Sequence, residues 1–377
     1  MMHLAQFKSV SFGGALVCAA LSLVGCGADK PQPRPLDSLT PKIVGRPVWS
    51  ANVSGVDFPL AVAVNGGIFT IAGSDGTVLA LDAASGREVW RASAGAKIGA
   101  GVGSDGRFAA VVTRDGELVT FEQGQVKWRK PLAVRVMTPP LVAGERIFVI
   151  GVDRVVQAFD AIDGRKLWAL QRSNDPLALA QGSVLAAFKD TLVVGQGPRM
   201  AGVDPLRGTI RWEVPVGSPR GANESERLAD LVGPAVRVGD VLCARSFQAA
   251  VGCVNAETGT VVWARNVGGT DPVAADNQFV FGADATDRMS AWKFGSGDVA
   301  WTSDKLQYRR LSAPLSVGKT VVYGDGDGTV HWFARDTGEP QLRLPTDGSP
   351  IVAVPVISGA TMLIVTRKGG LFAFSPD

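Results

Sequence analysis

The chain has 377 residues, and its 38 lysines and arginines nearly balance 35 aspartates and glutamates, which leaves a net charge of +3. The basic residues are not clustered, so nothing in the sequence indicates a nucleic-acid partner. Of the two histidines, His3 falls in a segment that we expect to be removed, and His331 alone cannot build a multi-histidine metal site. We expect no cofactor and no metal ion. His331 lies in the alternating segment TVHWFA, which predicts a strand-face residue and not a catalyst.

Residues 1–25 have the pattern of a secretory signal. One lysine, Lys8, precedes an uncharged apolar run from about Val10 to Val24, which is too short to favour a membrane span. The run ends in LVGC, which resembles the lipobox of bacterial lipoproteins, in which cleavage precedes the cysteine and the cysteine is then acylated. The resemblance implies a lipid anchor on Cys26, and Gly27 after it favours the outer membrane. A plain signal peptide with an incidental cysteine is the alternative.

The segment after Cys26 is rich in proline. GADKPQPRPLDSLTPK has four prolines and few side chains to bury. This composition predicts a semi-extended tether over residues 26–44, followed by a folded domain over residues 45–377.

A strand-turn-strand pattern recurs along the chain. Its clearest copy is GTVLALDAASGREVW, in which a β-rich run, a turn at Gly86 and a second strand end at Trp90. Further copies end at Trp128, Trp168, Trp212, Trp263, Trp301 and Leu342, while RPVW (to Trp49) holds only the last strand and RKGGLFAFSPD only the first. Trp49 and Leu342 are 293 residues apart in seven intervals, so the period is about 42 residues.

Two more strands precede each copy, for example TPPLVAG and RIFVIG, which makes four strands per repeat. Four strands in about 40–45 residues is the spacing of a propeller blade. The eight repeats predict an all-β, eight-bladed β-propeller whose last blade is closed by the N-terminal strand at Trp49. We expect the repeat tryptophans to pack between adjacent blades, and Trp292 and Trp332 to be packing residues too.

Two connections between blades are longer than the others. The first follows Trp168 and carries Leu177 and Leu179, and the second follows Trp212. The second carries Glu224, Glu226, Arg227, Leu228, Asp230 and Leu231. Both join an outer strand to the next inner strand, so they should form one patch on one face. Apolar residues rimmed by charge indicate a protein partner, and tolerated surface insertions are the alternative.

Two further local patterns have a structural interpretation. Cys243 and Cys253 lie on adjacent strands of one blade and fit either a cross-strand disulfide or two buried thiols. The usual cross-strand Cβ separation is long for a disulfide, which favours two thiols. The segment from Asp325 to Gly328 is similar to the start of a calcium loop but lacks the later acids, so we predict a hairpin turn.

The sequence as a whole resembles the BamB family, lipoproteins of the outer-membrane β-barrel assembly machinery (the BAM complex). The likeness rests on the lipobox, the ALD..SG...W repeats, the final GGLFAFS, and the segments LALAQGSVLAAF and ERLADLVGPAVRVGD. These two segments look like those by which this family contacts the barrel-assembly protein BamA. Leu177 and Leu179 match the family's Leu-x-Leu, and Asp230 matches the first acid of its Asp-x-Asp. Ala180 and Val232 stand where the family has Arg and Asp, so a charged contact pair is expected to be missing, with Arg227 or Glu226 in compensation.

The resemblance implies a non-enzymatic scaffold on the periplasmic face of the outer membrane, with no catalytic residues and no cofactor. Its partners would be BamA, the BAM complex, unfolded outer-membrane protein clients, and the membrane through the lipid on Cys26. The alternative is a quinone-cofactor-binding propeller or dehydrogenase-like protein, because that class shares the repeat. The chain is short for that class, lacks its adjacent cysteine pair and shows no cluster of acids and asparagine for its metal.

Overall fold

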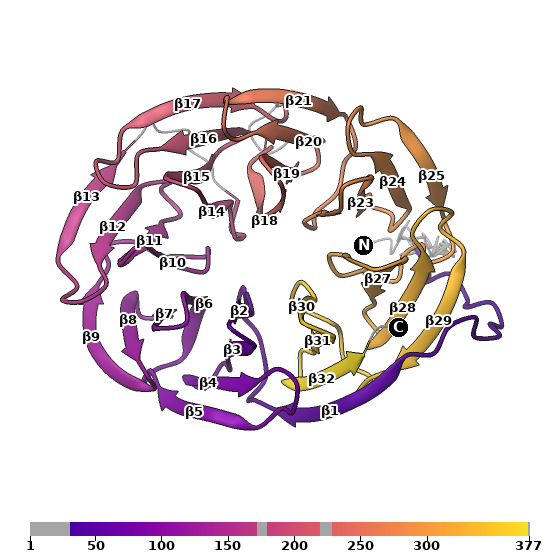
Figure 1. Cartoon of the computed structure of the whole chain (residues 1–377), viewed down its shortest axis with the longest axis horizontal. Helices are drawn as coiled ribbons and strands as arrows, with labels where there is room; N and C mark the ends of the chain where they lie inside the picture. The colour runs from indigo at the N-terminus through magenta and orange to yellow at the C-terminus, as the bar shows by residue number, and fades with distance from the viewer. Residues whose placement is uncertain (1–30, 172–178, 219–227, 376–377) are drawn as a thin grey trace, which may run out of the picture. The chain divides into compact units, whose positions relative to one another are not determined.

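The computed structural model describes residues 31–171, 179–218 and 228–375. The chain divides into two units, Met1–Gln32 and Pro33–Asp377. The second unit consists of eight four-stranded antiparallel sheets that follow one another around a ring (Figure 1). The predicted all-β, eight-bladed propeller is therefore confirmed. In the part of the chain that the structure describes, no helix has the length and hydropathy needed to cross a membrane.

The first four blades follow the predicted order from inner to outer strand. Blade 1 contains β2 (Ala63–Asn65), β3 (Ile68–Ala72), β4 (Thr77–Asp82) and β5 (Glu88–Ser93). Blade 2 contains β6 (Ile98–Ser104), β7 (Phe108–Thr113), β8 (Glu117–Glu122) and β9 (Gln125–Pro131). Blade 3 contains β10 (Leu141–Ala143), β11 (Arg146–Ile150), β12 (Val156–Asp160) and β13 (Lys166–Leu170). Blade 4 contains β14 (Leu185–Phe188), β15 (Thr191–Gln196), β16 (Arg199–Val203) and β17 (Ile210–Pro215).

The remaining blades repeat this order, and the last one joins the two ends of the propeller. Blade 5 contains β18 (Leu231–Val238), β19 (Val241–Ser246), β20 (Ala250–Asn255) and β21 (Thr260–Arg265). Blade 6 contains β22 (Ala274–Ala275), β23 (Phe279–Ala283), β24 (Met289–Lys293) and β25 (Val299–Ser303). Blade 7 contains β26 (Leu315–Val317), β27 (Thr320–Gly324), β28 (Thr329–Ala334) and β29 (Pro340–Pro345). Blade 8 contains β30 (Val356–Ser358), β31 (Thr361–Val365) and β32 (Gly370–Ser375), and its outer strand is β1 (Arg46–Asn52).

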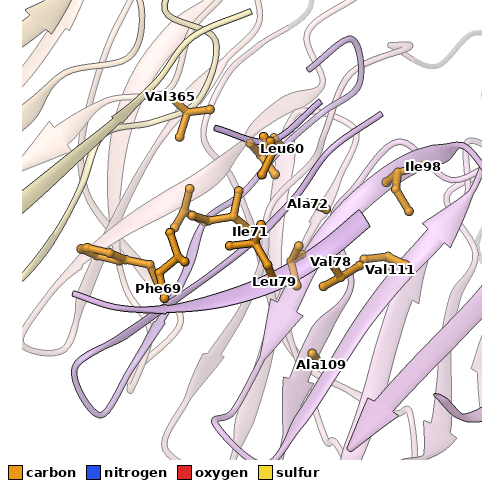
Figure 2. Close-up of a cluster of buried hydrophobic side chains, with 14 of the residues drawn as sticks. Leu60, Phe69, Ile71, Ala72, Val78, Leu79, Ile98, Ala109, Val111 and Val365 are labelled. Atoms are coloured by element: carbon orange, nitrogen blue, oxygen red, sulfur yellow. The ribbon is translucent and has the colours of Figure 1, made fainter. Parts of the chain in front are cut away.

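The two middle strands of each blade carry the core. Because blades stack face against face, both faces of these strands are covered, and their sequences are continuous apolar runs rather than alternating ones. In blade 1, for example, Phe69, Ile71 and Leu79 are at most 1 % exposed. Figure 2 shows these side chains between Val365 of blade 8 and Val111 of blade 2. The core is therefore a ring of interfaces between blades.

The repeat tryptophans join blades 1 to 7 and join blade 8 to blade 1, which confirms their predicted packing role. The indole N–H of Trp301 on β25 donates to the carbonyl of Arg335 in the outer turn of blade 7, at 2.8 Å. The same ring covers Gly338, where a Cβ atom would lie 2.6 Å from the indole. Seven tryptophans cover a turn glycine of the following blade in this way: Trp49 on Gly86, Trp90 on Gly124, Trp128 on Gly164, Trp168 on Gly208, Trp212 on Gly259, Trp263 on Gly297 and Trp301 on Gly338. Trp292 and Trp332 are also buried, at 1 % exposure.

The joint between blades 7 and 8 is built differently. The outer turn of blade 8 does not exist as a turn, because its two strands, β32 and β1, come from opposite ends of the propeller. Leu342 stands at the tryptophan position of blade 7, and the chain that enters β1 covers it, with a hypothetical Cβ of Gly45 only 2.5 Å from the Leu342 side chain. Leu342 thus replaces the tryptophan at the one joint where the following blade has no outer turn for a tryptophan to cover.

The chain before β1 lies against the propeller. We call residues 33–45 the N-terminal strap. The backbone N–H of Lys42 donates to the carbonyl of Gln341 on β29 at 2.8 Å, and the strap runs along this outer strand (Figure 1). Leu36 packs against the core cluster of blades 6 and 7, and Ile43 packs against that of blades 7 and 8. Most of the segment expected to be a tether thus contacts the propeller.

The cysteine pair corrects a prediction. Cys243 and Cys253 face each other across β19 and β20 and form a disulfide, with Cα atoms 4.0 Å apart. We favoured two thiols because of the usual cross-strand spacing. This pair belongs to the closely spaced class of antiparallel positions, in which the side chains approach more nearly. The sequence does not tell which class a given pair falls in.

Candidate functional site

The candidate site lies on the face that carries the connections from each outer strand to the next inner strand. The two long connections run from β13 to β14 and from β17 to β18. Leu177 lies outside the described residues, as do Glu224, Glu226 and Arg227 of the second connection and Cys26. Leu179 and Asp230 are described, and the structure brings them into contact.

Asp230 links the two long connections to blade 3. One carboxylate oxygen accepts a hydrogen bond from the backbone N–H of Leu179 at 2.7 Å, and the other accepts one from the Arg154 guanidinium at 2.6 Å. The side chains of Asp230 and Arg154 are only 12 % and 17 % exposed. Such a charge-assisted and largely buried pair is stronger than a surface ion pair. Asp230 therefore fixes the position of Leu179, which is half-buried at the edge of the patch.

Arg154 is a site residue that the sequence analysis missed. It lies in the turn between β11 and β12 with a positive φ of 63°. Gly76, Gly116 and Gly328 stand at this place in blades 1, 2 and 7, whereas Asp287 stands there in blade 6 with the same φ of 63°. A bulky residue at such a turn stores strain, which is often found at functional sites. Because Asp287 replaces glycine in the equivalent turn of blade 6 too, the sequence pattern alone does not mark Arg154 as a site residue.

Backbone hydrogen bonds hold the second connection in place. The N–H of Leu231 donates to the carbonyl of Gly197 at 2.8 Å, and the N–H of Phe247 donates to the carbonyl of Asp230 at 2.9 Å. The hydroxyl of Ser246 donates to the carbonyl of Ala229 at 2.5 Å. The patch is thus attached to blades 4 and 5 as well as to blade 3.

A small cleft of about 30 Å³ separates the two connections from blade 3. Its walls include Met137, Ile150, Arg154, Leu179, Gln181 and Asp230. This volume is close to that of one water molecule in the liquid, so the cleft is too small for an organic cofactor.

The two positions that depart from the family pattern lie in different environments. Ala180 is exposed beside Leu179, so a longer side chain there would extend into solvent. Val232 is fully buried and pairs across the sheet with Arg245 of β19. In this chain, position 232 is therefore part of the interior and not of the surface patch.

Arg245 supports the neighbouring connection from inside the propeller. Its guanidinium is completely buried and donates to the backbone carbonyls of Val267, Gly268, Asp271 and Ala283 at 2.6–3.1 Å. Burial lowers the pKa of Arg245 to about 10 and raises the pKa of Asp271. The side-chain amide of Gln181 donates to Thr270 in the same connection at 2.9 Å. The connection between blades 5 and 6 thereby borders the patch.

His331 belongs to a separate buried cluster under the N-terminal strap. It lies on β28, as predicted, with its Nε2 atom 3.0 Å from Asp325 in the hairpin turn before that strand. Burial lowers the pKa of His331 below its ordinary value of 6.5. Burial opposes ionisation of Asp325, but the hydrogen bonds from His331 and Thr329 prevail and lower its pKa. Arg309 donates to Asp325 at 2.9 Å and to the strap carbonyl of Arg34 at 3.2 Å, which gives the cluster a structural role.

The described residues contain no group of three histidine, cysteine or acidic side chains arranged to hold a metal ion. The segment from Asp325 to Gly328 forms the predicted hairpin turn between β27 and β28. The disulfide joins Cys243 and Cys253, which are ten positions apart in the sequence.

Comparison with known proteins agrees with the propeller fold. The family model for "Outer membrane protein assembly factor BamB" matches residues 74–303. The protein of that name from Burkholderia pseudomallei is 33 % identical over 374 residues, which cover 97 % of this chain and 98 % of the relative. The crystal structure of BamB from Moraxella catarrhalis superposes with a TM-score of 0.79, covers 88 % of this chain and 100 % of that one, and is 23 % identical.

A quinohemoprotein alcohol dehydrogenase from Comamonas testosteroni is also similar in structure, with a TM-score of 0.66 over 88 % of this chain and 76 % of the enzyme. At 14 % identity this likeness concerns the fold alone. The relatives with high coverage are named as assembly factors and not as enzymes. The chain belongs to the family of the outer membrane protein assembly factor BamB.

Proposed function

We propose that the protein is a non-enzymatic scaffold of the outer-membrane β-barrel assembly machinery that supports the folding and insertion of outer-membrane proteins. Membership of the BamB family supports this role. In this proposal residues 1–25 are removed as a signal, and lipids on Cys26 hold the propeller on the periplasmic face of the outer membrane. The LVGC motif supports the anchor.

The proposed partner surface is the patch formed by the two long connections, and its proposed partner is BamA. The observation that carries this assignment is the convergence of Leu179 and Asp230, two residues 51 positions apart, through a direct hydrogen bond. Leu177, which precedes Leu179 by two residues, would supply a second apolar contact. Both carboxylate oxygens of Asp230 have partners within the chain, so Asp230 acts by holding the patch in shape.

Capture of BamA tests the surface. Leu177→Asp and Leu179→Asp place a charge on an apolar contact, and we expect each to weaken capture by purified, immobilised protein more than tenfold. Thr40→Asp, on the exposed part of the strap, adds the same charge elsewhere and should leave capture unchanged. Normal capture by both leucine variants would refute the assignment of the surface.

A second comparison tests the role of Asp230. If Asp230 holds Leu179 in place through its pair with Arg154, then Arg154→Ala and Asp230→Ala should weaken capture to a similar extent. If Asp230 instead contacts BamA directly, Asp230→Ala should have the larger effect by a wide margin. The melting temperature of each variant shows whether the propeller remains folded.

Unfolded outer-membrane proteins are the proposed clients. The rival role as a quinone-dependent enzyme predicts a quinone absorbance band or dehydrogenase activity after reconstitution. Depletion of the protein in its own cells should lower the amount of folded outer-membrane proteins. Expression of wild type in the depleted cells should restore that amount, and expression of Cys26→Ala, which lacks the proposed lipid anchor, should restore it only in small part.

A further inference from the structure

The N-terminal strap fixes the point at which the chain leaves the propeller. At its beginning, the N–H of Arg34 donates to the carbonyl of Gln307 at 2.9 Å, and its guanidinium forms an ion pair with Asp304 at 2.8 Å. Arg309, itself 8 % exposed, donates to the Arg34 carbonyl at 3.2 Å. Gln307 and Asp304 belong to the connection between blades 6 and 7. The first residues of the strap are thus tied to this connection between blades 6 and 7.

Further contacts hold the strap along its length. Leu36 packs on the apolar cluster that includes Leu306 and Phe333. Arg343 donates to the carbonyl of Asp37 at 3.2 Å. Because apolar contacts, ion pairs and backbone hydrogen bonds all contribute, the strap is held as part of the blade rather than as a loose linker.

The docked strap leaves a short linker to the proposed anchor. Cys26 precedes Pro33 by seven residues, which span at most about 25 Å when fully extended. If the strap were free, the linker would run from Cys26 to Arg46, twenty residues that span at most about 70 Å. Docking therefore shortens the permitted distance between the anchor and the propeller about threefold.

We propose that the strap turns the outer rim of blades 6 and 7 toward the membrane, so that this rim is the surface that meets the lipid bilayer. The inference rests on the lipid anchor of the proposed function and adds to it the orientation of the propeller. Asp304 and Lys305 form ion pairs with Arg34 and Asp37 of the strap. The candidate partner patch lies on blades 3 to 5. The patch lies on the same face as the connection that holds Arg34, but its two long connections flank blade 4 and so stand farther around the ring from the strap.

The test uses two matched positions on opposite sides of the ring. Val126 on β9 and Val299 on β25 each precede the outer-strand tryptophan of their blade by two residues and are 42 % and 58 % exposed. Figure 1 shows these two strands on opposite sides of the propeller. Each valine is replaced by cysteine in turn and labelled with a fluorescent donor, since the two native propeller cysteines form a disulfide. The lipidated proteins are reconstituted into phosphatidylethanolamine–phosphatidylglycerol vesicles that contain a headgroup-labelled acceptor lipid.

We expect energy transfer to the membrane to be higher from position 299 than from position 126. Leu36→Asp places a charge in the apolar cluster and Arg34→Asp repels Asp304, so each should release the strap and remove the difference. Thr40→Asp adds the same charge at an exposed strap position, and the difference in energy transfer between positions 299 and 126 should remain. Melting curves of the variants verify that the propeller is folded.

Three results would overturn the inference. Equal transfer from both positions in vesicle-bound wild type would show that the rim has no fixed orientation, while the anchor itself would stand. A difference that survives both Leu36→Asp and Arg34→Asp would show that the strap does not set it. Failure of the lipidated wild type to float with vesicles would instead refute the anchor, and the orientation with it.

Discussion

Replacing Gly338 with alanine is expected to break the joint between blades 6 and 7. Gly338 has a φ of 71°, and its Cβ would lie 2.6–2.9 Å from three atoms of the Trp301 ring. The indole would have to move, with loss of its 2.8 Å hydrogen bond to Arg335. The lost hydrogen bond costs about 1 kcal/mol, and overpacking of this kind costs a further 1–3 kcal/mol or so.

Gly318 in the same blade supplies the control. It also has a positive φ, of 56°, but nothing lies within 4 Å of its hypothetical Cβ. Gly318→Ala therefore carries the backbone strain without the clash, and the difference between the two variants isolates the tryptophan contact. We expect Gly338→Ala to be less stable than Gly318→Ala by about 2–4 kcal/mol.

Thermal unfolding measures this difference. With an unfolding entropy of about 2 cal/mol/K per residue, a propeller of this size should melt about 3–5 °C lower in the Gly338→Ala variant than in the control. In a Trp301→Ala background the two glycine variants should become equivalent, because the clashing ring is absent. Equal melting temperatures of the two single variants would refute the view that the tryptophan–glycine contact joins the blades.

The disulfide and the buried histidine lead to two more expected outcomes. The propeller, denatured without reductant, should show no free thiol from Cys243 or Cys253, and two free thiols would contradict the pairing. Reduction of the disulfide should lower the free energy of unfolding by about 2–3 kcal/mol, as expected for a loop of this length. Because the folded chain keeps His331 neutral while the unfolded chain binds a proton near pH 6.5, its contribution to stability is full above that pH and is lost as the pH falls through it. The melting temperature should therefore drop more between pH 7.5 and 5.5 in wild type than in His331→Gln, and an equal drop in both would show that His331 is not the group responsible.

The architecture could be predicted because its signals are local and repeated. A turn glycine and an outer-strand tryptophan recur at nearly constant spacing, and each has a direct physical role in the blade that contains it or in the next one. The closure of blade 8 followed from counting half-repeats at the two ends. Even the exception at Leu342 was visible, although its cause, the missing turn in blade 8, required the structure.

The features that were missed depend on contacts between residues distant in sequence. Leu36 was placed in a semi-extended tether, because the surface on which it packs is formed by residues some 270 positions later. Arg154 was not noticed because its partner, Asp230, is 76 residues away. The disulfide was judged from average strand geometry, which does not describe the close approach of Cys243 and Cys253. Local patterns thus define the blades, whereas the site and the strap arise from how the blades meet.

The strap also determines how the propeller bears mechanical load. A pulling force that enters from the N-terminal side meets the contacts of Arg34 and Leu36 with blades 6 and 7 before it reaches β1. Without them, the force would act directly on Arg46, the first residue of the strand whose pairing with β32 closes the ring. The contacts of the strap therefore take up tension on the N-terminal chain before it can break the pairing of β1 with β32.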